Sequence, residues 1–74
     1  MSIARVIELS TTSEESFEDA INTGITRATS TLRGVESAWV KDMNVLVGED
    51  GSISGYKVNL AITFVLEDVE QQLG

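Results

Sequence analysis

The recurrence of large apolar residues at every second position over 56–66 is the feature that most constrains this chain. Every second residue in this segment is apolar or aromatic: Tyr56, Val58, Leu60, Ile62, Phe64 and Leu66. Because successive side chains of a strand point to opposite faces, the pattern predicts a β-strand with one buried face. Such a strand needs partner strands and a second layer that covers its apolar side.

An amphipathic helix over 13–33 is predicted to supply that cover. Its apolar residues follow helical spacing: Phe17, Ala20, Ile21, Gly24, Ile25, Ala28 and Leu32. Thr12 or Ser13 is predicted as the N-cap, and Gly34 is expected just beyond the C-terminal end. A glycine inside a helix costs about 1 kcal/mol relative to alanine, so Gly24 indicates close packing against the sheet.

Two further alternating segments complete a single α+β domain over residues 1–74, a three-stranded antiparallel sheet packed on one helix. The predicted order is β-α-β-β, with strands over 3–9, 35–47 and 53–67, the helix over 13–33, and an acidic, disordered tail over 68–74. Gly48 to Ser52 have the composition of a hairpin loop.

The sheet face opposite the helix is predicted to carry both apolar and polar groups. By parity along 35–47 it includes Ser37, Trp39, Lys41, Met43, Val45 and Val47, and from the last strand Lys57, Asn59 and Thr63. No second helix exists to cover this face, and it is too apolar for simple exposure to water. We therefore expect neighbouring subunits to bury it, with Trp39 at an interface or facing a central cavity.

Composition points the same way and excludes several function classes. The 74 residues include no cysteine and no histidine, so disulfides, a Ser-His-Asp triad and a histidine base are impossible, and a structural zinc site is not expected. Small chains that have neither disulfides nor a structural metal usually rely on oligomerisation for stability. The formal charge of −7 argues against nucleic acid and against an anionic membrane surface. No signal-peptide pattern opens the sequence, so a cytoplasmic location is expected.

Adjacent carboxylates are the only residues that suggest acid–base chemistry. They occur at Glu14/Glu15, Glu18/Asp19 and Glu49/Asp50, at the predicted helix start and at the tip of the hairpin. Both places favour solvated surface over a catalytic pair, so we expect no enzyme.

Four segments, in this order and spacing, resemble the dodecin family over residues 3–67: SFEDAI at 16–21, RATSTLRG at 27–34, GEDGSISGYKVNL at 48–60 and FVLE at 64–67. The resemblance implies a hollow homododecamer. It also implies flavin, either FMN or riboflavin, held in pairs at subunit interfaces for storage and quenching rather than turnover.

The resemblance also implies site residues. In flavin-binding dodecins a tryptophan early in the second strand stacks on the isoalloxazine ring. Its position falls near Ser37 when counted from Leu32 and near Ala38 when counted back from the hairpin loop, whereas the only tryptophan here is Trp39. A glutamine that hydrogen-bonds the ring edge aligns with Lys57, which donates but cannot accept. Trp39, Lys57 and Ser37 are thus the predicted flavin-binding residues. The alternative roles are a subunit-interface anchor for Trp39 and a solvated or ion-paired strand residue for Lys57.

Two further functions remain open on the sequence. One is a dodecin-like shell without flavin that binds cations such as calcium through oxygen ligands of the kind found at Asp42, Asn44, Glu49 and Asp50. No loop has the ligand spacing of an EF-hand, so no residue is assigned as a metal ligand. The other is a small structural or partner-binding oligomer unrelated to dodecins.

Overall fold

The computed structural model describes residues 3–66, which form one helix and three strands. In chain order they are β1 (Ala4–Ser13), α1 (Phe17–Thr31), β2 (Val35–Val47) and β3 (Ile53–Val65). The β-α-β-β order and the antiparallel sheet agree with the prediction. The predicted tail over 68–74, and residue 67 of the last strand, lie outside the described residues.

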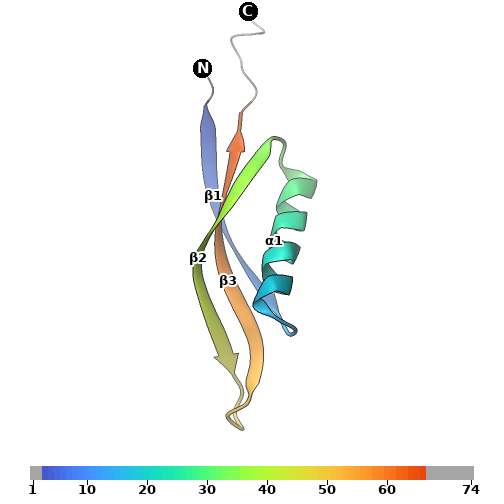
Figure 1. Cartoon of the computed structure of the whole chain (residues 1–74), viewed down its shortest axis with the longest axis vertical. Coiled ribbons are helices and arrows are strands. Elements are labelled where there is room, and N and C mark those ends of the chain that lie inside the picture. Colours follow the sequence, from blue (N-terminus) through green and yellow to red (C-terminus); the bar gives the residue numbers. More distant parts are fainter. Residues whose placement is uncertain (1–2, 67–74) are drawn as a thin grey trace, which may run out of the picture.

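β3 is the central strand, because the sheet has the order β1-β3-β2 and both neighbours run antiparallel to it. Ile62, for example, pairs with Ile7 of β1 on one side and with Ala38 of β2 on the other. The helix lies along one face of this sheet, and the tip of the β2–β3 hairpin extends beyond it (Figure 1). The other face has no covering layer within residues 3–66.

The core lies between the helix and the predicted apolar face of β3. Val58, Leu60 and Ile62 are fully buried, and the small helix residues Ala20 and Ala28 pack against them. Small side chains let the helix approach the sheet closely, so the helix stripe and the alternation of β3 form one contact surface. At the start of the helix, the rings of Phe17 and Tyr56 pack edge to face with centroids 5.1 Å apart.

The predicted N-cap was wrong. The first strand does not end at Leu9 but continues through Ser13, and the helix cap is Ser16, whose side chain accepts from the backbone N–H of Asp19. Ser13 is buried instead, where its hydroxyl accepts from the backbone N–H groups of Glu15 and Ser16. The run of small polar residues continues β1 because its backbone pairs with β3 as far as Tyr56.

The helix is also shorter than predicted at its other end, closing at Thr31 with Leu32 as C-cap. Gly34 has a φ of +72°, a left-handed conformation that favours glycine. A Cβ atom there would lie 2.6 Å from the backbone oxygen of Val65, and the Gly34 carbonyl accepts from the Val65 N–H. This glycine therefore permits the chain to turn from the helix into β2 directly against β3.

The predicted face of Met43 and Val45 was wrong because β2 contains irregularities, whereas Val47 follows a second irregularity and pairs with Ile53 on the predicted face. The register of β2 against β3 shifts between Val40 and Asp42 and again between Leu46 and Val47. A one-residue bulge moves every following side chain to the other face. Met43 and Val45 consequently pair with Val58 and Tyr56 on the helix side, while Asp42 and Asn44 join Trp39 on the opposite side.

Candidate functional site

The candidate site is the sheet face opposite the helix, here called the open face. Pairing partners share a face of the sheet, so the register assigns its residues in rows that cross the three strands. From one end, the rows of β2, β3 and β1 are Ser37–Thr63–Val6, Trp39–Ala61–Glu8, Asp42–Asn59–Ser10 and Asn44–Lys57–Thr12. Adjacent rows are roughly 7 Å apart along the strands.

Trp39 is the dominant apolar group of the open face. Its side chain remains 72% exposed, although the paired Ala61 is only 2% exposed. A shallow hollow of about 310 Å³ lies beside it, lined by Ser37, Ala38, Trp39 and Thr63. The indole therefore forms a flat platform bordered by two hydroxyl groups, on rigid strand backbone.

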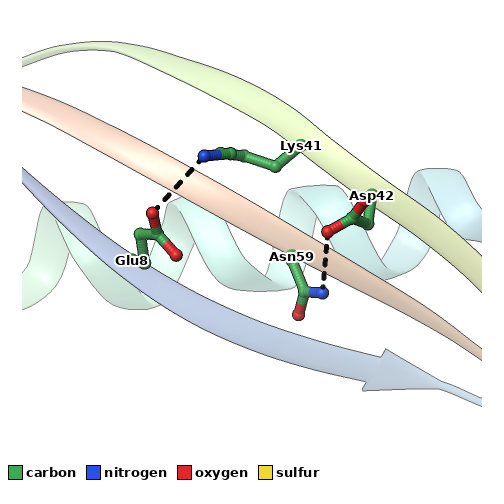
Figure 2. A network of polar contacts seen from close by, with 4 residues as sticks. All are labelled: Glu8, Lys41, Asp42 and Asn59. Atoms are coloured by element: carbon green, nitrogen blue, oxygen red, sulfur yellow. Dashed lines mark hydrogen bonds and ion pairs between the residues drawn. The ribbon is translucent and has the colours of Figure 1, made fainter.

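A polar network extends from the Trp39 row, which contains Glu8, into the next row and connects all three strands (Figure 2). The Lys41 Nζ is 3.5 Å from Oε2 of Glu8, and the side-chain amide of Asn59 donates to Asp42 over 3.4 Å. The Ser10 hydroxyl donates to the side-chain oxygen of Asn59. These groups border a second hollow of about 330 Å³ next to the Trp39 platform. The site thus joins an aromatic surface to a set of hydrogen-bonding groups.

Lys57 lies farther along the open face, in the row with Thr12 and Asn44. Its side chain is half-buried. Within residues 3–66 the only ion pair is the one between Lys41 and Glu8, so Lys57 forms none there. Lys57 lies two rows beyond the row of Trp39, which is roughly 13 Å along β3. The structure therefore brings Ser37 and Trp39 together, but it does not bring Lys57 to the same point within one chain.

The four oxygen-bearing residues named for cation binding do not form one cluster. Asp42 and Asn44 lie on the open face, whereas Glu49 and Asp50 lie in the hairpin loop. In that loop the Ser52 side chain and backbone N–H donate to Asp50 and hold the pKa of its carboxyl below the usual 3.8. Over the described part of the chain, no group of three or more His, Cys, Asp or Glu side chains lies close enough together to hold a metal ion.

The remaining carboxylate pairs stay on exposed surface at the helix start. Among them, Asp19 accepts a hydrogen bond from the Ser13 hydroxyl and so stabilises the turn before the helix. In residues 3–66 there is no helix long and apolar enough to cross a membrane.

The groups on the open face fit a flavin by their chemistry. A flavin has a flat ring that stacks on an indole, and a polyhydroxyl side chain that needs hydrogen-bond partners. The exposed ring of Trp39 offers the first, and the adjacent Asp42, Asn59 and Ser10 offer the second. When bound, the flavin would supply its own redox and light-absorbing chemistry.

Comparison with known proteins agrees with this fold. The family model described as "Dodecin" matches residues 3–67. The chain belongs to the dodecin family. A dodecin from Thermus thermophilus is 38% identical over 66 residues, which cover 89% of this chain and 94% of that protein. A crystal structure of a T. thermophilus dodecin variant superposes with a TM-score of 0.83 at 37% identity, covering 92% of this chain and 100% of the other.

A second dodecin relative is described by the ion that it binds. It is the calcium dodecin from Mycobacterium tuberculosis, a calcium-chelating antigen with a novel calcium-binding site. It superposes with a TM-score of 0.75 at 28% identity and covers 85% of this chain and 89% of its own. Solved dodecins similar to this chain therefore include one that is described as binding calcium.

Sequence reasoning missed the role of Glu8 and Ser10 and placed Asp42 on the wrong face. These residues come together only across the sheet, through the pairing of β1 with β3 and through the bulge in β2. The short alternation in β1 was the available signal for Glu8, but it does not identify the strand that lies next to it.

Proposed function

We propose that this dodecin-family chain is a cytoplasmic flavin-storage protein, which assembles as a homododecamer and holds flavin on its open face. The supporting observation is the exposed indole of Trp39 beside a hollow of about 310 Å³. A large aromatic group that remains 72% exposed on a rigid sheet is typical of a surface completed by a ligand or by another subunit.

Flavin explains more of the open face than subunit contact alone. Stacking of an isoalloxazine ring on the indole contributes on the order of 1 kcal/mol beyond the buried area. Electron transfer from the indole to the excited ring would also quench its fluorescence. The second hollow, with its carboxylate, amide and hydroxyl groups, suits the hydroxyl groups of the flavin side chain. Membership of the dodecin family favours sequestration of the flavin over turnover.

A fluorescence titration tests the proposal. Riboflavin and FMN are each titrated with the purified protein, and we expect quenching that saturates at a fixed ratio of flavin to subunit. Trp39→Ala should lose most of the quenching and weaken binding, whereas Trp39→Phe should retain part of the affinity because a ring remains. Val47→Ala is the matched control, since it removes an exposed apolar group from the same strand.

The assembly is measured on the same samples. Sedimentation should give a particle of about 96 kDa, which is twelve times the 8.0 kDa chain. Binding that is unchanged in Trp39→Ala would reject the indole as the platform. An absence of flavin binding by an intact dodecamer would reject the proposed function itself.

Calcium binding is the second candidate, and the calcium dodecin of M. tuberculosis favours it. The open face of this chain offers the side-chain oxygens of Asp42, Asn44 and Asn59 in adjacent rows. Calorimetric titration with calcium, with magnesium as the control ion, tests this candidate. Heat of binding that is present in the native protein and lost in Asp42→Asn would support it.

A further inference from the structure

We propose that the linkage between Asp50 and Gly51 at the hairpin tip is a site of isoaspartate formation, and that the closed hairpin loop protects it. This modification of the backbone does not depend on the proposed flavin-binding function. Asp50 is the only aspartate of the chain that is followed by glycine, and the chain has no asparagine followed by glycine.

The reaction joins two neighbouring groups of the chain. The backbone nitrogen of Gly51 attacks the Cγ of the protonated Asp50 carboxyl group and forms a new N–C bond. The amide proton and the carboxyl hydroxyl leave as one water molecule, which gives a five-membered succinimide. One water molecule then opens the ring at either carbonyl, so that the chain continues through the side-chain carbonyl as isoaspartate or through the original one as aspartate.

Two features of the hairpin tip favour this reaction over the same reaction elsewhere in the chain. Asp50 and Gly51 are both exposed, so water reaches them. Glycine has no side chain to hinder the attack, and a Cβ atom built on Gly51 would meet no other atom within 4 Å. At Asp19 and Asp42, by contrast, the next residue carries a side chain. The linkage after Asp50 is therefore the most susceptible of the three.

The closed loop holds the attacking nitrogen away from the carboxyl group. The Gly51 N–H donates to the Gly48 carbonyl over 3.0 Å, and the Gly48 N–H donates to the Ser52 carbonyl over 2.7 Å. With the φ of +87° at Gly51, these bonds are those of a type I turn followed by a bulge glycine. Asp50 is the third residue of this turn, where ψ is about 0°. Such a ψ turns the Gly51 nitrogen away from the Asp50 side chain, whereas ring closure requires the two to eclipse.

Ser52 restrains the second reacting group. Its backbone N–H and its hydroxyl both donate to Oδ1 of Asp50, over 3.0 and 2.7 Å. These bonds fix the orientation of the side chain and hold the pKa of the carboxyl below its usual value. An ionised carboxylate resists the attack, because the oxygen that leaves as water must carry a proton. Both hydrogen bonds therefore oppose ring closure.

Isoaspartate would change the end of the hairpin. It routes the main chain through the Cβ atom, so the loop between Gly48 and Ser52 gains one backbone atom. The extra atom weakens the 2.7 Å bond that closes the loop. It also lies next to the pair of Val47 with Ile53, the last pair that joins β2 to β3. The modification would therefore loosen the hairpin from its tip.

Incubation near neutral pH tests the inference on four samples. They are the native oligomer, the native chain unfolded in guanidinium chloride, Ser52→Ala, and the matched control Ser54→Ala. The control removes an exposed hydroxyl of β3 that is not among the groups bonded to Asp50. Circular dichroism and sedimentation verify that both variants keep the fold and the assembly.

Mass spectrometry of the tryptic peptide 42–57 follows the reaction. Isoaspartate separates by chromatography at unchanged mass, and the succinimide is lighter by one water molecule. Fragment ions distinguish Asp50 from Asp42, which lies in the same peptide and serves as the internal control.

In the unfolded chain we expect isoaspartate at Asp50 to form about tenfold or more faster than in the folded protein, because the hydrogen bonds to its carboxylate are lost. It should also form faster there than at Asp42. In the folded protein, Ser52→Ala should accelerate the reaction by roughly threefold or more, since one of the two hydrogen bonds is removed. Ser54→Ala should leave the rate unchanged.

Three results would overturn the inference. Equal rates in the folded and the unfolded native chain would reject protection by the loop. A rate in Ser52→Ala equal to that in Ser54→Ala would reject the restraint by the Ser52 hydroxyl. An unfolded chain that modifies Asp42 as fast as Asp50 would reject the site itself.

Discussion

Substituting Gly24 with alanine tests how closely the helix packs on the sheet. A Cβ atom at this position would lie 2.6 Å from the Thr11 Oγ1 and 2.7 Å from the Leu60 Cδ1. Real contacts of this kind are almost never shorter than 3.0 Å, so one of these groups has to move. Leu60 is fully buried, and Thr11 has a β-branched side chain on a paired strand, so neither moves freely.

Two opposing effects determine the magnitude. Overpacking a core costs about 1–3 kcal/mol, and replacing a helical glycine by alanine returns about 1 kcal/mol. We therefore expect Gly24→Ala to lower the free energy of unfolding by about 1 kcal/mol. Asn22→Ala, at an exposed position of the same helix, should instead leave stability unchanged or raise it slightly.

Urea unfolding at a fixed protomer concentration measures these changes, because the stability of an oligomer depends on concentration. The double variant Gly24→Ala/Thr11→Ala removes the nearest clashing atom. It should therefore be more stable than the sum of the single changes by about 0.5–1 kcal/mol. If Gly24→Ala instead stabilises the protein by the full helix-propensity gain, with no coupling to Thr11, the close helix–sheet packing is wrong.

Three further changes test other parts of the fold. Gly34→Ala should destabilise by about 2 kcal/mol or more in the same urea assay, because it combines a left-handed φ of +72° with a Cβ placed 2.6 Å from a β3 backbone oxygen. Phe17→Ala should lose roughly 2–3 kcal/mol, below the usual range for a fully buried phenylalanine, and simultaneous loss of Tyr56 should be less than additive because the rings touch. NMR titration should give Asp50 a pKa below 3.8, and Ser52→Ala should raise that pKa because it removes a hydrogen bond to the carboxylate. Since folding lowers the pKa of Asp50, its hydrogen bonds stabilise the fold at pH values above the unfolded-state pKa. That contribution is lost as the pH falls through the folded-state pKa.

Periodicity predicted the parts of the fold that depend on one continuous pattern. The alternation of β3 placed Val58, Leu60 and Ile62 in the core, and the helix spacing placed Ala20 and Ala28 against them. Both predictions hold because burial of a single face imposes a regular repeat on the residues. Gly24 and Gly34 likewise lie where the backbone or the helix makes a close approach.

Local exceptions to these patterns could not be predicted. The shift between Val40 and Asp42 leaves no mark in the residue types, yet it exchanges the faces of Met43 and Asn44. At the start of the helix, several small polar residues compete for the cap, and pairing of β1 with β3 decides in favour of Ser16. The capping and strand propensities of single residues carry no information about this pairing between distant strands.

In the candidate site, too, some residues could be placed from the sequence pattern and others could not. Trp39 and Ser37 lie on the predicted face, because they follow the irregularity between Val35 and Ser37 and precede the shift between Val40 and Asp42. The Glu8–Lys41 pair and the contact of Asp42 with Asn59 depend on strand order and on the bulge, so no local pattern indicated them. Lys57 lies on the predicted face, and the distance that separates it from Trp39 follows only from the register.

The central position of β3 has a consequence for synthesis on the ribosome. β1 and β2 do not touch each other in the sheet, and each pairs only with β3, the last of the four elements to be translated. Ala4, near the beginning of β1, has to wait for Val65 before its partner exists. Because proteins rich in such distant pairings fold slowly, the nascent chain exposes the apolar sides of its helix and its two outer strands until translation of β3 is complete. A chain interrupted before Ile53 would therefore form no smaller version of this fold and would be a substrate for chaperones and proteases.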